Sequence, residues 1–168
     1  MNERCETLYG CQLGDAMTFR LTQSLFDRIT ARARACFPDE ACGFVVERNG
    51  ACDVVLVTNI QNQKHAENPE QFPRTAVIAY TMGPEAAPVL IGHDRGELTI
   101  RAIFHSHPQH AAYFSAEDKK QATLWDEPSY PDAAQIVVSV IDGEVRESKA
   151  FRWSEPQRDY VEVPLEVA

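Results

Sequence analysis

The chain has 168 residues, a length that suits one domain of ordinary size and is too short for two. Its composition, 44% hydrophobic and 24% charged, is typical of a globular protein, and no stretch approaches the roughly 20 apolar residues that a membrane helix needs. The formal net charge of −9 argues against binding to a phosphate backbone, so we expect neither a nucleic acid nor a membrane as a partner.

The N-terminal segment and the cysteines indicate a cytoplasmic protein. Residues 1–10 contain no apolar run of the kind that a secretory signal requires. The five cysteines, at positions 5, 11, 36, 42 and 52, are an odd number and form no Cys-x2-Cys pair, so neither a disulfide framework nor a thiolate zinc site is indicated. We predict reduced thiols, with Cys36 and Cys42 packed as small hydrophobic residues.

The first part of the chain predicts a helix and a hairpin. Apolar residues recur at helical spacing over 22–36, where Thr22 is placed to cap the helix and Pro38 follows its end. Residues 41–47 predict a buried strand, Asn49-Gly50 a turn, and residues 52–58 the returning strand. The polar segment 59–73 has no periodicity, which predicts a long surface loop that bears on substrate access.

Shorter elements follow. Residues 75–80 predict a strand, 84–94 a helix that ends at Gly96, and 98–105 another strand. After a loop over 108–114, Ser115 begins the next helix. Residues 134–141 and 145–153 predict a second hairpin, and residues 160–167 alternate as a last strand.

This order predicts a mixed α/β fold with a central sheet and covering helices. The segment 154–168 either covers a sheet edge or pairs with a partner chain. Trp125 and Trp153 are expected in or beside the core, because large aromatic side chains dominate core burial.

The stretch FHSHPQHAAYFSAED, residues 104–118, holds the candidate metal ligands. His105 and His107 lie two residues apart at the end of the predicted strand, so their side chains point to the same face and can bind one ion together. Asp118 is the natural third ligand. Because a catalytic zinc site typically has three protein ligands and leaves the fourth position to water, we predict a Zn²⁺ site at these three residues.

Ser115 and Asp118 also fit a structural role. Ser-x-x-Asp before a helical pattern resembles a capping box, in which two side chains satisfy free amides at a helix start. Both roles are compatible, because the positive helix end keeps a carboxylate in the first turn ionised. Ser115 is not expected to be a nucleophile, since no histidine base is free once His105 and His107 bind metal; its hydroxyl can instead hydrogen-bond a developing oxyanion.

The stretch 104–118 supplies no proton acceptor for hydrolysis. A carboxylate is needed that takes a proton from the metal-activated water and returns it to the leaving amine. The strongest candidate is Glu40, in the segment PDEACG at the entrance to a buried strand. On the residues alone, Glu40 and its neighbour Asp39 are equally placed for this role.

Together these residues resemble the JAMM (MPN-plus) metalloprotease family. The shared pattern is His105-x-His107-x7-Ser115-x2-Asp118, with Glu40 upstream in a Pro-x-Glu-x-Cys-Gly setting, and the resemblance covers roughly residues 20–141. It implies an MPN domain with a cytidine-deaminase-like mixed sheet flanked by helices, as a single domain over 1–168 with a catalytic core of about 20–153. Phe114 departs from the pattern, because many relatives have proline before the serine.

The resemblance also implies roles and a substrate class. His105, His107 and Asp118 would bind zinc, Glu40 would be the general acid/base, and Ser115 would stabilise the tetrahedral intermediate. The short form of the chain is similar to bacterial members, which implies hydrolysis of a peptide or isopeptide bond after the C-terminal Gly-Gly of a ubiquitin-like sulfur carrier. The sequence does not indicate an oligomeric state.

Three other functions compete with this interpretation. A zinc deaminase would need a His-x-Glu and a Pro-Cys-x-x-Cys pattern, and neither is present. A non-catalytic scaffold of the same fold would not need all five residues intact. A peptidase of this family that acts on cell-wall or phage-tail peptides would share every catalytic residue, so this alternative stays open.

The remaining polar residues near the motif are expected to be structural. Ser106 lies inside the motif, but strand alternation turns it away from the metal. His93 is expected near a helix end, and His65 and His110 as exposed loop residues, although either of the last two can reach substrate.

Overall fold

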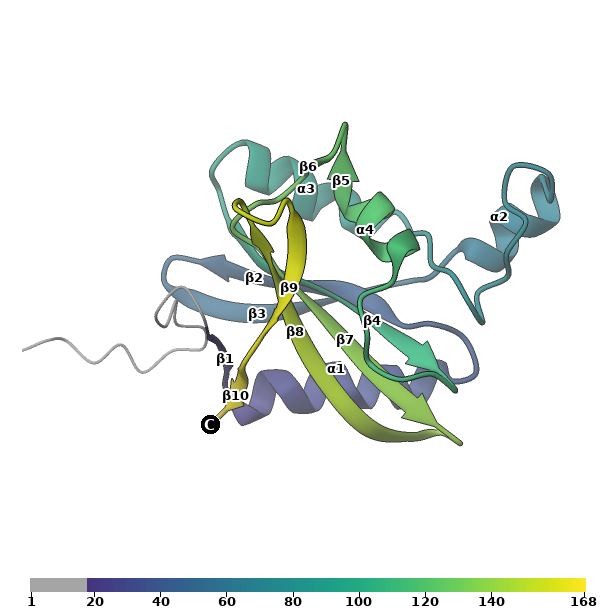
Figure 1. The fold of residues 1–168 in the computed structure, drawn as a ribbon, viewed down its shortest axis with the longest axis horizontal. Helices are drawn as coiled ribbons and strands as arrows, with labels where there is room; N and C mark the ends of the chain where they lie inside the picture. Colours follow the sequence, from purple (N-terminus) through teal and green to yellow (C-terminus); the bar gives the residue numbers. More distant parts are fainter. Residues whose placement is uncertain (1–17) are drawn as a thin grey trace, which may run out of the picture.

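The computed structural model describes residues 18–168, so the predicted state of Cys5 and Cys11 falls outside the described residues. A six-stranded mixed sheet organises this part of the chain, in the order β3-β2-β4-β7-β8-β9 (Figure 1). Its strands are β2 (Cys42–Arg48), β3 (Ala51–Val57), β4 (Thr99–Pro108), β7 (Ala134–Ile141), β8 (Glu144–Ser154) and β9 (Asp159–Val163). Strands β4 and β7 are parallel, and the other neighbours are antiparallel.

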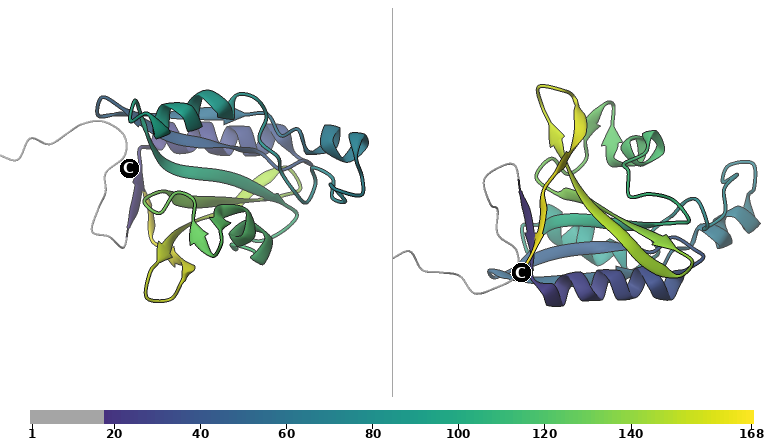
Figure 2. Two further views of the ribbon diagram at one scale, coloured as in Figure 1. Left: turned by 90° about the horizontal axis from the view of Figure 1, so that it is seen from above. Right: turned by 60° about the horizontal axis from the view of Figure 1, so that its bottom comes forward.

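Helices cover both faces of this sheet. Helix α1 (Gln23–Cys36) lies along one face, whereas α3 (Ala86–Asp94) and α4 (Ala116–Ala122) lie on the other (Figures 1 and 2). A short helix, α2 (Gln61–Glu67), projects from one end. Within residues 18–168, every helix is too short or too polar to cross a membrane. The predicted mixed α/β architecture is confirmed.

Helix α1 forms where its capping residue and apolar spacing predict it. The hydroxyl of Thr22 accepts a hydrogen bond from the backbone N–H of Leu25, which satisfies one free donor of the first turn. Leu25, Ile29 and Ala33 are buried against the sheet, in the same core cluster as Phe104. Burial of a large apolar side chain contributes about 1.5–3 kcal/mol, so this face holds the helix in place.

Strand alternation on β4 sends its side chains to two different places. Phe104 packs in the core between α1 and the sheet, and its ring lies against the backbone of Gly43. A Cβ atom at position 43 would lie 2.5 Å from this ring, which is too close, so the position requires glycine. His105 and His107 therefore point to the opposite face, which carries α3 and α4. Ser106 turns back, and its Oγ accepts a hydrogen bond of 2.8 Å from Ala41 N. The prediction that Ser106 faces away from the ligands is confirmed.

Two predictions for residues 59–80 were wrong. The expected loop over 59–73 contains α2, which is polar along its length but rich in good helix formers, and Asn59 Oδ1 accepts a hydrogen bond from Gln61 N at its start. The expected strand at 75–80 is a turn segment. Its amides bond locally or to side chains, as when Asn62 Oδ1 accepts a hydrogen bond from Ala76 N, so no ladder forms.

The end of the chain also differs from prediction. Pro164 has no N–H for a sheet ladder, and the predicted strand over 160–167 divides there into β9 and β10 (Leu165–Val167). Strand β9 forms an edge of the large sheet. Strand β10 leaves that sheet and pairs in parallel with β1 (Phe19–Leu21), which the sequence did not predict.

Trp125 is the clearest error in the predicted core. It is 89% exposed, at the tip of a small hairpin formed by β5 (Thr123–Leu124) and β6 (Glu127–Pro128). Trp125 and Asp126 both have positive φ, 51° and 61°, as a two-residue hairpin turn requires. The turn lies away from the sheet and directs the ring to solvent. Trp153, in contrast, packs against the cluster of Ala112, Val137, Phe151 and Tyr160, as predicted.

Candidate metal centre

Three side chains converge between β4 and α4. Nε2 of His105 lies 3.0 Å from Nε2 of His107, Asp118 Oδ1 lies 3.2 Å from His105 Nε2, and Asp118 Oδ2 lies 3.4 Å from His107 Nε2. A tetrahedral zinc ion with bonds of about 2.0–2.1 Å needs ligand atoms about 3.3–3.4 Å apart. The observed separations are close to that value, so this group can hold a metal ion.

The backbone around these residues fixes their positions. Strand β4 extends to Pro108, further than predicted, and therefore carries both histidines in the sheet. Nδ1 of His107 is bonded to the carbonyl of Ala111 at 3.0 Å, which leaves Nε2 as the ligand atom. Phe114, the residue that departs from the JAMM pattern, packs on Phe151 and Tyr160 and so holds the loop before α4 against the sheet.

Ser115 forms the predicted capping box. Its hydroxyl accepts a hydrogen bond from Asp118 N at 3.1 Å, and Asp118 Oδ2 accepts one from Ser115 N at 2.8 Å. The Ser115 hydroxyl also donates to Oδ2 at 2.6 Å. Capping and metal binding are compatible at Asp118, since the contacts that cap α4 also aim its carboxylate at the histidines.

The protonation states of the group suit cation binding. Burial lowers the pKa of His105, which favours the neutral imidazole that a metal requires. Burial alone would raise the pKa of Asp118, but hydrogen bonds with His105, His107 and Ser115 lower it well below its usual range. The site thus combines a neutral imidazole with a stable negative charge.

The structure separates Glu40 from Asp39. Glu40 is 7% exposed and lines a cavity of about 400 Å³ together with His107, Ser115 and Asp118. Asp39 is only half-buried and accepts a hydrogen bond from the side chain of Asn62, outside that lining. Of these two adjacent acids, only Glu40 faces the metal ligands.

Burial and the negative charge of Asp118 raise the pKa of Glu40 to about 9, although the positive charge of Arg74 opposes them. In the metal-free protein this carboxyl is therefore protonated at neutral pH. A protonated acid at this position can donate its proton to a leaving group.

This shift predicts a pH-dependent effect of Glu40→Gln on stability. The carboxyl has a higher pKa in the folded protein than its ordinary 4.5, so its favourable contribution is complete below pH 4.5 and is lost as the pH rises toward 9. Glutamine stays neutral throughout. We expect the metal-free variant to match the wild type near pH 4.5 and to be more stable by several kcal/mol, up to about 5 kcal/mol, at pH 8. Urea unfolding with a chelator at both pH values measures the difference; a pH-independent difference would contradict the prediction.

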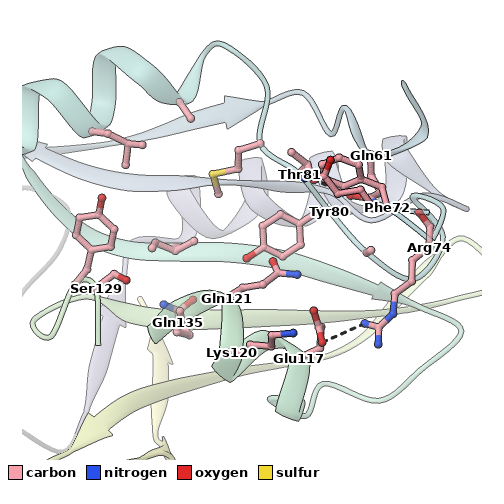
Figure 3. A pocket seen from close by; sticks show the side chains of 18 of the residues that line it. Gln61, Phe72, Arg74, Tyr80, Thr81, Glu117, Lys120, Gln121, Ser129 and Gln135 are labelled. Carbon is pink, nitrogen blue, oxygen red and sulfur yellow. Dashed lines mark hydrogen bonds and ion pairs between the residues drawn. The ribbon is translucent and has the colours of Figure 1, made fainter. Parts of the chain in front are cut away.

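A second cavity adjoins the first. It has a volume of about 930 Å³ and is bordered by apolar residues that include Phe44, Met82 and Ile103 (Figure 3). The two cavities share lining residues at their junction, namely Arg74, Ala79, Tyr80, Glu117 and Gln121. His107 and Asp118 thus lie at one end of a larger hollow.

Sequence reasoning missed three residues that shape the site. Tyr80 is stacked on His105, with ring centroids 5.0 Å apart, and lies at the junction of the cavities. Asn59 donates to the carbonyls of Glu40 and Ala79 and so joins the strand entrance to the segment before Tyr80. Arg74 forms an ion pair with Glu117 at the same junction. No local pattern marks them, because each acts through contacts between distant segments.

His93 lies near the end of a helix and His110 is exposed, as expected, and His110 also lines the smaller cavity. His65 was expected to be exposed in a loop, but it lies in α2 and is partly buried. His93 Nδ1 accepts a hydrogen bond from Ile100 N, and its ring packs on Tyr130. Nδ1 of His65 is bonded to the carbonyl of Phe72. Cys42 is fully buried and Cys36 is partly buried against the core, as predicted.

A sequence model of the prokaryotic homologues of the JAB domain matches residues 22–154, which is most of the chain. The chain belongs to this prokaryotic JAB family. The family includes metalloproteases, and His105, His107 and Asp118 of this chain form a group that could hold a metal ion. No match is found among curated protein sequences.

Solved structures share the JAB fold of this chain. A solution structure of a protein from Desulfitobacterium hafniense is 21% identical, with a TM-score of 0.62 over 90% of this chain and 93% of that one. A solution structure from Salinibacter ruber is 22% identical, with a TM-score of 0.56 over 90% and 91%. The crystal structure of a JAB1/MPN domain protein from Archaeoglobus fulgidus is 17% identical, with a TM-score of 0.51 over 92% and 99%. At these identities the likeness concerns the fold.

Proposed function

We propose that this JAB-family protein is a zinc-dependent peptidase. Its substrate in this proposal is a ubiquitin-like protein of the sulfur-carrier type, cleaved in the cytoplasm at the peptide or isopeptide bond that follows its C-terminal Gly-Gly. The observation that carries the proposal is the meeting of Glu40 with His107 and Asp118 in one cavity, although Glu40 precedes β2 and the ligands come from β4 and α4.

The residues divide the chemistry among them. His105, His107 and Asp118 would hold the ion, which when bound supplies a Lewis acid that polarises the scissile carbonyl and activates water. When the ion is bound, its positive charge would favour the carboxylate form of Glu40, which accepts a proton from the attacking water and delivers it to the nitrogen of the leaving amine as the C–N bond breaks. The C–N bond breaks to give a neutral amine and an acyl product that keeps the second proton of the water as a carboxylic acid. Transfer of that proton to the amine gives the final carboxylate and ammonium products.

Ser115 is proposed to hydrogen-bond the oxygen that gains negative charge during the reaction. Its hydroxyl donates to Asp118 Oδ2 in this structure, so this role requires the O–H bond to rotate toward the substrate. Rotation about a single C–O bond leaves the other half of the capping box, from Ser115 N to Asp118, intact.

The shape of the site supports a slim extended substrate. His105 is fully buried and Asp118 is 8% exposed, so a scissile carbonyl must enter deeply to reach them. Glycine allows the closest approach of a backbone to its surroundings, because it has no side chain. A Gly-Gly end suits the smaller cavity, and the preceding residues suit the apolar wall of the larger one.

The test is incubation of zinc-loaded protein with ubiquitin-like sulfur carriers that are extended past Gly-Gly, followed by mass spectrometry. We expect loss of the extension and a product that ends in Gly-Gly, with no loss after chelation. Cleavage of cell-wall or phage-tail peptides in place of every carrier would support the alternative peptidase. Absence of cleavage with all these substrates would favour a non-catalytic scaffold.

A further inference from the structure

Arg74 provides a positive charge beside the proposed proton donor. Of the described residues that line the smaller cavity, it alone is a lysine or an arginine. Glu40 lines the same cavity of about 400 Å³, so the guanidinium and the Glu40 carboxyl border one space. Figure 3 shows Arg74 at the cavity wall, turned toward Glu117.

The backbone of Arg74 is fixed by a buried hydrogen bond, whereas its guanidinium forms only a weak, exposed ion pair. The buried Gln61 donates a hydrogen bond of 2.7 Å to the carbonyl of Arg74, and Thr81 fixes the other end of the Gln61 amide. The ion pair with Glu117 is 3.8 Å long, and both side chains are more than a third exposed. Such exposed pairs contribute little, so a better-placed anion can replace Glu117.

The chemistry of amide hydrolysis indicates which anionic group of the substrate comes near the Arg74 guanidinium. Glu40 must reach the nitrogen of the leaving amine to deliver its proton, so that nitrogen lies beside Glu40. In an α-amino acid, the carboxylate is separated from this nitrogen by one carbon atom. A carboxylate at that position enters the cavity that Glu40 and Arg74 both line, where the guanidinium is the group suited to bind both of its oxygens.

We propose that Arg74 binds the free α-carboxylate of the leaving group, so that the protein removes a carboxy-terminal α-amino acid attached through its α-nitrogen. This inference rests on the proposed peptidase function and defines its substrate class. A lysine side chain linked through its ε-nitrogen has only a methylene group at the corresponding position. Arg74 would then have no anion to bind, and such isopeptides are poor substrates.

Matched substrates test this proposal. A sulfur carrier that ends in Gly-Gly-Ala is prepared as the free acid and as the C-terminal amide, which differ only in the charge that Arg74 is proposed to read. We expect kcat/KM to be about 10- to 100-fold higher for the acid, as for the loss of a charge-assisted hydrogen bond. Arg74→Gln should abolish the preference by slowing the acid alone, and Arg74→Lys should restore part of it.

Lys120→Gln is the matched control. It removes the same charge from the larger cavity but lies outside the lining of the smaller one, so the acid-to-amide ratio should stay as in the wild type. Glu117→Gln removes the competing anion and should increase the ratio. Equal rates for acid and amide in the wild type would overturn the proposal, as would a preference that survives Arg74→Gln.

A binding measurement separates this proposal from the peptidase function. The peptide Gly-Gly-Ala, as acid and as amide, is titrated calorimetrically into the zinc-loaded Glu40→Gln protein, which requires no turnover. We expect the acid to bind about 10- to 100-fold more tightly, and the difference to vanish when Arg74→Gln is added. Tight acid binding without cleavage of any carrier would count against the peptidase function alone. Equal binding of acid and amide would count against the role of Arg74 alone.

Discussion

Replacement of Glu40 by glutamine is expected to reduce kcat by about 10²- to 10⁴-fold while the protein keeps its zinc. Glutamine has nearly the same shape as glutamate but neither accepts nor delivers a proton at this position. The metal ligands come from β4 and α4, so they do not depend on the charge of residue 40. The measurement is the rate of trimming of a Gly-Gly extended carrier, together with the zinc content of the same sample.

Asp39→Asn is the matched control for this prediction. It makes the same chemical change one residue earlier, in a side chain that contacts Asn62 and does not line the cavity. We expect near wild-type activity. A large loss of kcat in Asp39→Asn, together with a normal kcat in Glu40→Gln, would assign the proton transfer to Asp39 and contradict the proposed mechanism.

Removal of a ligand is the second large effect. The wild type should bind about one zinc ion per chain, because the ligand group offers three donor atoms around one centre. His107→Ala leaves only two of them, and we expect zinc affinity to fall on the order of 100-fold or more, a larger loss than the 10- to 100-fold typical of residues that support ligands. Competition with a chromogenic chelator measures this affinity.

His110→Ala supplies the comparison. His110 lines the same cavity but lies outside the group of converging ligand atoms, so its zinc affinity should match that of the wild type. Equal affinity for all three proteins would mean that the ion, if bound, lies elsewhere. Loss of zinc only in His107→Ala would identify the ligand group without any measurement of activity.

Periodicity and turn residues predicted the elements that build the core. Helix α1 begins after Thr22 and ends before Pro38, as its cap and its breaker indicate. The hairpin from β2 to β3 turns at Asn49-Gly50, where both residues have positive φ. These signals are local, because each depends on a few neighbouring residues. The same holds for His105 and His107, whose shared face follows from strand alternation.

Contacts between distant segments were harder to predict. Glu40 could not be chosen over Asp39 until the fold placed one of them beside the ligands. Tyr80 belongs to a segment predicted as a strand, but side chains such as those of Asn59 and Asn62 hold its backbone in another form. Trp125 was assigned to the core from its size alone, and the conformation of a two-residue turn decided its exposure.

The two tryptophans of the chain give the protein an optical signal for its metal site. Trp153 packs on Tyr160, which contacts Phe114, and the Phe114 ring lies 6.5 Å from that of His105. Trp125 is in solvent and adds a constant background of emission. A Trp125→Phe variant would therefore fluoresce from Trp153 alone, so that a shift of its emission on zinc addition would report a change in the packing of Phe114 and Tyr160 beside His105.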